Sequence, residues 1–189
     1  MFDWQTPARQ NHRVTSLRPL TLTDAEALDE AMGTLEGLDD FSWFGFPEPG
    51  RMRARVSSGD AVTPTRGNLA VVTDGGELVG EVSWHLVSHG PNGECWNIGV
   101  YLLPTGRGQG HGTAAQRLLA EYLFANTTMQ RIEAETEGGN VAEQRALEKA
   151  GFTRDGLLRE ALFRDGAYRD MVIYSVLRGE YRKTTEPHA

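Results

Sequence analysis

The sequence predicts an α+β fold in which helices flank a mixed, mostly antiparallel sheet of about six to seven strands. Two hairpins indicate the antiparallel part, because the turn DGGE at 74–77 and the turn Asp165-Gly166 each separate two strand-like runs. A strand–helix–strand crossover over 95–136 lies between the hairpins and makes the sheet mixed.

The first third of the chain is expected to hold one strand and two helices. VTSLRPL at 14–20 is strand-like. Thr23 can cap the next helix, with Glu26 three residues later completing a capping box. An apolar stripe at helical spacing follows in Leu28, Met32 and Leu35. A second short helix is expected through RMRARVSS, residues 51–58.

The remaining elements follow from alternation, helical periodicity and turn residues. Strands are expected at LAVVTD, LVGEVSWHLVS, ECWNIGVYLL and QRIEAET, and a final hairpin at LLREALFRDGAYRDMVIYSVL. A helix over 113–126 has one apolar face, made of Ala114, Ala115, Leu118, Leu119, Tyr122 and Leu123. A later helix begins at Asn140 and is stopped by Gly151.

Length and composition bound the class of protein. No repeat or linker divides the 189 residues, so we expect one domain over 13–180 with loose ends at 1–12 and 182–189. The net charge of -7 argues against a general nucleic-acid binder. No run approaches the roughly 20 apolar residues that span a bilayer, and the start resembles no leader, so a cytoplasmic protein without membrane contact is expected.

Cysteine and histidine usage argues against a disulfide or a metal centre. Cys95 is the only cysteine, which excludes an intramolecular disulfide and a thiolate metal cluster. His85 and His89 are four residues apart, but they fall on a strand and its exit rather than on one helix face. We therefore expect no metal cofactor.

The segment YLLPTGRGQGHGTAAQ carries a glycine at every second position from Gly106 to Gly112. It lacks the lysine and the ending of a nucleotide phosphate loop, and its spacing does not fit the dinucleotide fingerprint. A strand, a glycine loop and an immediate helix still suit an anion, since a helix N-terminus presents unsatisfied N–H donors. Arg107 adds a cation, and Thr113 can cap the helix or contact a phosphate. The alternative is a plain glycine-rich connector.

These residues resemble a known family. RGQGHG at 107–112 matches the [QR]-x-x-G-x-[GA] loop with which GNAT acyltransferases bind the pyrophosphate of acetyl-coenzyme A. NIGVYLLP before the loop, NVAEQRALEKAGF after it and the hairpin RDGAYRDMVIYSVL resemble motifs of the RimJ/RimL-like N-acetyltransferase branch in the same order. The resemblance covers about residues 13–180.

The resemblance implies a GNAT fold with an acyl-CoA cleft where two central strands, 95–102 and 130–136, splay apart. It implies acetyl-CoA as cosubstrate and an amine that attacks the acetyl carbon directly, with no metal. The residues implied in coenzyme binding are Val100, Leu102, Arg107, Gly108, Gln109, Gly110, His111, Gly112, Thr113 and Asn140.

The chain departs from the family at the proton-transfer positions. Asn97 stands where many relatives carry a glutamate base, Glu143 where they often place a serine beside the leaving sulfur, and Leu147 where another branch has a tyrosine acid. Glu135 is the first candidate for the base, because its strand lines the cleft. Other candidates are a water relay or one of Glu133, His85 and His111.

Acceptor recognition is expected from DDFSWFGFPEPGR, residues 39–51, where Phe41, Trp43, Phe44 and Phe46 are densely spaced. These aromatic side chains form either a wall for an apolar acceptor or a core plug under the loop. Trp84 and Trp96 could extend such a wall. Nearby acids would attract a cationic amine or are simply solvated: Asp39, Asp40 and Glu48.

Two functions from different classes remain open at this point. The first is an acetyl-CoA-dependent N-acetyltransferase for a small amine or a peptide N-terminus. The second is a non-catalytic GNAT-fold protein that binds acyl-CoA or an amine. The absence of both familiar proton-transfer residues supports this alternative. A homodimer is open in either case.

Overall fold

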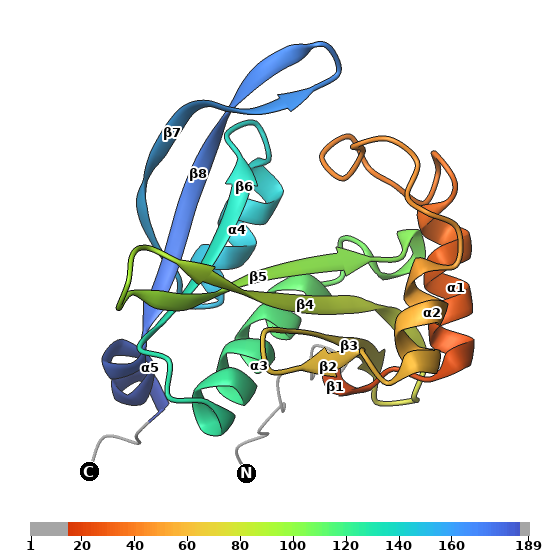
Figure 1. Cartoon of the computed structure of the whole chain (residues 1–189), viewed down its shortest axis with the longest axis horizontal. Helices are drawn as coiled ribbons and strands as arrows, with labels where there is room; N and C mark the ends of the chain where they lie inside the picture. The colour runs from red at the N-terminus through yellow and green to blue at the C-terminus, as the bar shows by residue number, and fades with distance from the viewer. Residues whose placement is uncertain (1–14, 186–189) are drawn as a thin grey trace, which may run out of the picture.

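The structure, a computed structural model, describes residues 15–185, which contain eight strands, five α-helices and one short 3-10 helix (Figure 1). In chain order these are β1 (Thr15–Pro19), α1 (Leu22–Met32), α2 (Arg51–Ser58), β2 (Val62–Thr63), β3 (Arg66–Thr73), β4 (Leu78–Ser88), β5 (Glu94–Leu102), η1 (Pro104–Gly106), α3 (His111–Asn126), β6 (Arg131–Glu137), α4 (Val141–Lys149), β7 (Thr153–Arg164), β8 (Ala167–Leu177) and α5 (Arg178–Thr185).

All strands join one sheet in the order β1-β3-β4-β5-β6-β8-β7, with the two-residue β2 paired to β3 beside this path. Every pair is antiparallel except β5–β6. The predicted α+β class and the mostly antiparallel sheet are thus confirmed. The sheet has more strands than expected, since β2 is too short to leave a period-2 pattern.

The central strands β5 and β6 pair over only three positions, the last being Ile98 with Ala134. Beyond Ile98, β5 continues to Leu102 and pairs only with β4. β6 continues to Glu137 and pairs only with β8. We call this divergence of β5 and β6 the splay. It confirms the predicted separation of the two central strands.

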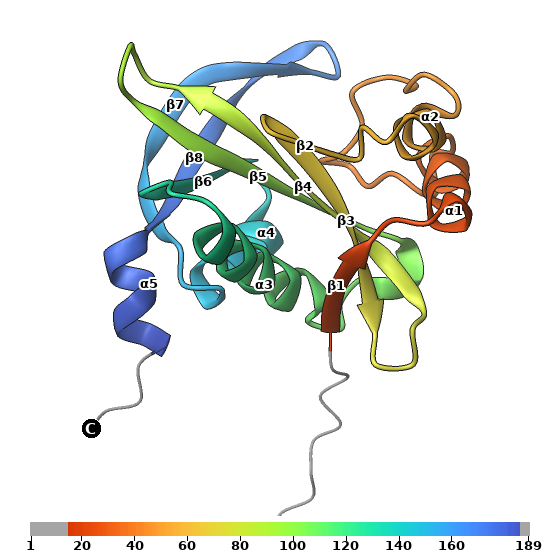
Figure 2. The ribbon, with the colours of Figure 1, turned by 60° about the horizontal axis from the view of Figure 1, so that its bottom comes forward.

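Helices lie on both faces of the sheet (Figure 2), and each face has its own core. Side chains of α3 and α4, such as Leu119 and Leu147, pack on one face with alternate residues of the central strands. Side chains of α1 and α2, such as Leu28 and Met52, pack on the other face with Ala70, Val72 and Tyr101. Alternation along β5 therefore decides which helices each residue meets.

The buried face of α3 shares only Ala115, Leu119 and Leu123 with the predicted one. Leu118 is half-buried and Tyr122 is 37% exposed, whereas the fully buried positions are His111, Ala115, Gln116, Leu119, Ala120, Leu123 and Phe124. The apolar stripe of α3 is broad, so the sequence pattern does not determine which part of it faces the sheet. Packing of Leu119 and Leu123 on the sheet decides it.

The first helix begins two residues earlier than predicted. Thr21, not Thr23, is the N-cap, and Asp24, not Glu26, completes the capping box. Asp24 is also ion-paired with Arg18 at 2.5 Å, so β1 and the helix start share this carboxylate. Leu35 lies after the helix end and is 69% exposed, so it extends no apolar stripe.

A fifth helix, α5, occupies part of the segment expected to be loose from 182 onward. Arg178 at its start donates to the carbonyl oxygens of Phe124 and Met129 at 2.7 and 2.9 Å, and stacks on the Phe124 ring. These bonds hold the helix against the end of α3. The expected loose end at 1–12 lies outside the described residues, as do residues 186–189 of the one expected at 182–189.

The β7–β8 hairpin and the α1–α2 loop rise on the same side of the sheet (Figure 1). The hairpin is fixed to the end of β6 by a 2.6 Å ion pair between Arg164 and Glu137. Among the helices of residues 15–185, none combines the length and the apolar character needed to cross a bilayer.

Candidate active site

The splay leaves one edge of β5 without a strand partner. On its other edge β5 pairs with β4 through Val82–Val100 and Gly80–Leu102, while β6 pairs with β5 only up to Ile98. Main-chain groups on an unpaired strand edge can hydrogen-bond an extended ligand that carries its own amides. The stretch 99–102 is therefore suited to such a ligand.

The glycine loop lies directly after this edge. A Cβ added to Gly106 would lie 2.7 Å from the Val79 carbonyl oxygen, so this glycine serves close packing. Gly108 and Gly110 have φ values of 71° and 86°, and a Cβ on either would meet nothing within 4 Å. Their surroundings are open, and their backbone favours glycine.

Gly110 is the N-cap of α3 and supplies no side-chain cap. The predicted capping by Thr113 is thus wrong, because the helix begins earlier, at His111. The first-turn N–H groups of α3 therefore have no capping side chain. They follow directly after Gly108 and Gly110, whose surroundings are open. An anion suits this arrangement, since the helix N-terminus carries partial positive charge.

Two side chains of the loop are engaged elsewhere. Arg107 donates from Nε to the Leu102 carbonyl oxygen at 3.1 Å and from Nη2 to the Gly37 carbonyl oxygen, so its guanidinium braces the loop. His111 is 1% exposed and its Nδ1 lies 2.9 Å from Thr15 Oγ1. Because its ring is buried against β1, His111, one of the alternative candidates for the base, is not exposed to a substrate.

The start of α4 contributes a buried carboxyl group. Asn140 accepts a hydrogen bond from the Glu143 N–H at 3.2 Å and so caps the helix. Glu143 accepts from Gln116 Nε2 on α3. Burial raises the pKa of Glu143 to about 7; the bond from Gln116 opposes this rise, and the Asp39 carboxylate adds to it.

Three carboxylates of β6 lie on the face that carries α1 and α2, opposite the core residues Ile132 and Ala134. Glu133 is paired with Arg131 at 2.5 Å, and Glu137 is paired with Arg164. Burial raises the pKa of Glu133, but hydrogen bonds from Arg131 and His89 outweigh it and lower the pKa. Glu135 is exposed and makes no hydrogen bond or ion pair with another described residue.

Asn97 and His85 lie on the strands beside these acids. Asn97 is opposite Glu133 in the parallel pair and opposite His85 in the antiparallel pair. His85 is exposed. Asn97, Glu135 and His85 therefore lie on the same face of the sheet, the one that carries α1 and α2, with Glu135 beyond the last β5–β6 pair.

The expected contribution of Trp84 and Trp96 to an acceptor wall is wrong. Both are 4% exposed and belong to the core under α3. Trp96 donates from Nε1 to Thr127 Oγ1 at 3.2 Å. Their even positions on β4 and β5 point them away from the α1–α2 face, which the spacing of tryptophans along the chain does not reveal.

The aromatic segment after α1 lines a pocket of about 420 Å³. Its walls include Met32, Leu38, Phe41, Phe44, Phe46 and Tyr101. Phe44 and Phe46 are 62% and 72% exposed, so they plug no core. Trp43 is half-buried outside this lining and packs edge-on against Phe46 with ring centroids 4.9 Å apart.

The same segment bridges the two sides of the splay. At its start, Tyr101 of β5 donates to the Gly37 carbonyl oxygen at 2.8 Å. Further along, Phe41 lies under the Arg164 guanidinium, 5.4 Å from its ring centroid, and beside Gly139, which follows β6. The α1–α2 loop thus covers the open end of the splay.

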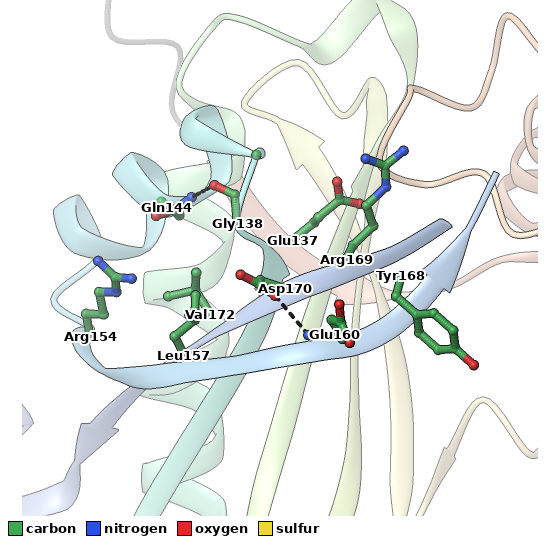
Figure 3. Close-up of a pocket in the computed structure, with 11 residues that line it drawn as sticks. Glu137, Gly138, Gln144, Arg154, Leu157, Glu160, Tyr168, Arg169, Asp170 and Val172 are labelled. Carbon is green, nitrogen blue, oxygen red and sulfur yellow. Dashed lines mark hydrogen bonds between the residues drawn. The ribbon is translucent and has the colours of Figure 1, made fainter. Parts of the chain in front are cut away.

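A second hollow, of about 630 Å³, lies between the β7–β8 hairpin and the turn before α4 (Figure 3). Gln144 donates to the Gly138 carbonyl oxygen at 2.9 Å on one side of it. On another side, the Asp170 carboxylate accepts from the Glu160 N–H at 2.8 Å where β7 bulges. Its lining is largely polar, in contrast to the aromatic pocket.

With its splayed parallel pair and its glycine loop before α3, the sheet and its helices have the GNAT fold. The family model described as "Acetyltransferase (GNAT) domain" matches residues 15–153, and the chain belongs to this family.

The relatives agree with this class. A probable N-acetyltransferase, YjcK of Bacillus subtilis, is 36% identical over 78 residues, which is 41% of this chain and 42% of YjcK. The match thus spans less than half of that relative. The spermidine N-acetyltransferase of Vibrio cholerae in complex with CoA and spermine superposes with a TM-score of 0.76 at 17% identity, covering 89% of this chain and 98% of the other. RimJ of Mycobacterium smegmatis in complex with CoA-disulfide gives 0.72 at 25% identity, with 89% and 84% covered.

Sequence reasoning missed four residues that shape this site: Gly37, Tyr101, Gln116 and Arg164. A glutamine inside the apolar stripe of α3 was a visible signal for Gln116. No local pattern points to the other three, because their partners lie 27 to 70 residues away in the chain.

Proposed function

We propose that this protein is an acetyl-CoA-dependent N-acetyltransferase of the RimJ/RimL-like branch that acts on a primary amine of a small molecule or of a peptide N-terminus. The observation that carries this proposal is the unpaired edge of β5 next to the open, uncapped start of α3. Coenzyme A has the two matching parts, an amide-bearing arm and a diphosphate. Such a donor also suits the expected cytoplasmic location.

In this proposal the diphosphate binds the main-chain N–H groups of 107–113, including Gly108, Gln109, Gly110, Gly112 and Thr113. The arm runs along Val100–Leu102, and Asn140 at the start of α4 holds its far side. Arg107 acts by shaping the loop, because its guanidinium donates to the carbonyl oxygens of Leu102 and Gly37. The CoA complexes of the V. cholerae and M. smegmatis neighbours support this donor.

The chemical step then needs a base for the ammonium and an acid for the sulfur. Glu135 takes the proton, the neutral amine attacks the acetyl carbon, and a main-chain N–H near Val100 polarises the carbonyl. The C–S bond breaks, and the thiolate takes a proton from the Glu143 carboxyl group, whose pKa of about 7 keeps much of it protonated at neutral pH. The amide nitrogen then gives its second proton to the Glu143 carboxylate, and Glu135 releases the first proton to solvent. Asn97 cannot be the base, because an amide accepts no proton. Its proposed role is to orient the amine.

The acceptor is proposed to be an amine on an apolar or aromatic body. The 420 Å³ pocket supports this, because it is lined by Phe41, Phe44 and Phe46 and lies at the covered end of the splay. The negative charge of Asp39 is close enough to affect Glu143, and it would attract an ammonium group. The Trp43→Ala variant distinguishes whether Trp43 contacts the acceptor or only supports Phe46.

A direct test is thiol release from acetyl-CoA with a panel of amines that differ in apolar bulk at equal charge. We expect turnover to rise with the size of the apolar body. If calorimetry shows coenzyme A binding but no amine of the panel releases thiol, the enzyme proposal fails and the non-catalytic binding protein replaces it. If coenzyme A itself does not bind, both fail.

A further inference from the structure

Three potential metal ligands converge at the paired end of β5 and β6, on the other side of Ile98 from the splay. His89 follows β4, Cys95 is the second residue of β5 and Glu133 lies on β6. His89 Nε2 lies 3.0 and 3.1 Å from the two Glu133 carboxylate oxygens and 3.5 Å from Cys95 Sγ. One ligand atom from each of the three lies within 4.8 Å of the others.

These separations fit the edges of a tetrahedral zinc site. Zinc binds imidazole nitrogen at about 2.0–2.1 Å, carboxylate oxygen at about 2.0–2.2 Å and thiolate at about 2.3 Å. Tetrahedral angles then place nitrogen and oxygen about 3.3 Å apart, and nitrogen and sulfur about 3.5–3.6 Å apart. The observed 3.0–3.1 and 3.5 Å need only small adjustments.

The surroundings hold the carboxylate in place and leave one side open. Arg131 donates from Nε to Glu133 Oε1 at 2.5 Å and from Nη1 to Ser175 Oγ at 2.9 Å. A second hydrogen-bond partner on a ligating carboxylate is the usual support for a metal ligand. Cys95 and Glu133 are 1% and 4% exposed, whereas the His89 side chain is 54% exposed, so water can reach the fourth position.

The charges also balance. A Zn²⁺ ion would be neutralised by the Cys95 thiolate and the Glu133 carboxylate, and the Arg131 guanidinium keeps its own partner in Asp155. Burial raises the pKa of the Cys95 thiol to about 12 without a metal, and the Glu133 charge adds to this. Zinc would have to displace that proton, so zinc binding should tighten as pH rises.

We propose that His89, Cys95 and Glu133 bind one Zn²⁺ ion whose fourth ligand is water. The ion would clip the β4–β5 turn to β6 at the base of the splay. This inference is independent of the proposed acyl transfer. It revises the expectation of no metal, which rested on the single cysteine and on histidines that share no helix face. The competing account is a metal-free network in which the thiol and imidazole only hydrogen-bond Glu133.

The test uses the full chain, freed of any affinity tag and stripped with a chelator. Zn²⁺ is titrated against a chromophoric chelator, and Co²⁺ is added separately to detect thiolate-to-metal charge transfer in the near ultraviolet. We expect one equivalent of Zn²⁺ and a cobalt charge-transfer band. His89→Ala should weaken zinc binding at least about tenfold, and Cys95→Ser should abolish the band.

His85→Ala is the matched control, because His85 is an exposed histidine of β4 outside the cluster, and it should bind zinc like the parent chain. His89→Ala decides the matter if Cys95→Ser fails to fold, since His89 is half exposed. The proposal is overturned if the parent chain binds no more Zn²⁺ than His89→Ala does. It is also overturned if Co²⁺ binds without a charge-transfer band.

Discussion

Arg107 of the glycine loop donates a hydrogen bond to the carbonyl oxygen of Gly37, which lies 70 residues earlier in the α1–α2 loop. The Tyr101 hydroxyl donates to the same oxygen at 2.8 Å. A Cβ on Gly37 would lie 1.7 Å from the Ala31 carbonyl oxygen, so the loop needs glycine there. The proposed donor loop and the proposed acceptor loop therefore share one anchor.

This anchor predicts that Tyr101→Phe disturbs acceptor binding more than coenzyme binding. Loss of the hydroxyl removes one of the two bonds to Gly37, and we expect a loss of about 0.5–1.5 kcal/mol of stability in denaturant unfolding. The acceptor KM should rise, while calorimetry should show coenzyme A affinity within about twofold. Tyr168→Phe, on an exposed tyrosine of the hairpin, should change neither. An unaltered acceptor KM in Tyr101→Phe would disconnect the anchor from acceptor binding.

Gly110→Asp is expected to lower coenzyme A affinity at least about tenfold, equivalent to about 1.4 kcal/mol. The substitution places a carboxylate at the uncapped start of α3, where it would take the position of the diphosphate. Gly76→Asp is a matched control, because Gly76 also has a positive φ, 81°, and open surroundings but lies in the β3–β4 turn. Equal affinity of Gly110→Asp and the parent chain would remove the loop from coenzyme binding. Arg107→Ala should weaken binding less than Gly110→Asp does.

Glu135→Gln is expected to lower kcat strongly at neutral pH and to leave coenzyme A affinity near that of the parent. The lost rate should return as pH rises, because a growing fraction of the amine is then already neutral. Steady-state rates from neutral to alkaline pH measure this, with Glu94→Gln, an exposed acid at the start of β5, as control. A loss below about threefold would remove Glu135 from the role of base and leave His85 or a water chain.

Glu143 should make stability fall with rising pH. Burial raises its pKa from the ordinary 4.5 to about 7, so the folded chain holds a proton that the unfolded chain has lost between these values. The stabilisation is complete below about 4.5, shrinks as pH rises through 7 and is then gone. The melting temperature of the parent should therefore drop from pH 5 to pH 8 relative to Glu143→Gln. Parallel melting curves of the two proteins would contradict the burial of an ionisable Glu143.

Trp43→Ala and Trp84→Ala separate the acceptor wall from the core. Trp84 is 4% exposed under α3, so its truncation should cost about 3–5 kcal/mol of stability. Trp43 is half-buried against the exposed Phe46, so its truncation should cost much less and should raise the acceptor KM. Thermal melts and acceptor kinetics distinguish the two. A large drop in melting temperature for Trp43→Ala with unchanged acceptor kinetics would assign Trp43 to the core.

Much of the fold could be predicted because it depends on residues close together in the chain. Alternation, turn residues and the glycine spacing located the hairpins, the α3 helix and the glycine loop, and Asn140 caps α4 as predicted. Errors arose where two neighbouring residues were locally equivalent. Thr21 and Thr23 can both cap a helix, and only the contact of Asp24 with Arg18 favours the first.

What the sequence by itself determined is the order of elements, the glycine loop and the resemblance to an acyltransferase family. The tertiary structure alone decided which side chains meet. Strand register turned Trp84 and Trp96 into the core, helix packing joined Gln116 to Glu143, and the β4–β5–β6 pairing gathered His89, Cys95 and Glu133. The physical reason is that local preferences act over a few residues, whereas these contacts depend on register and packing between segments up to 70 residues apart.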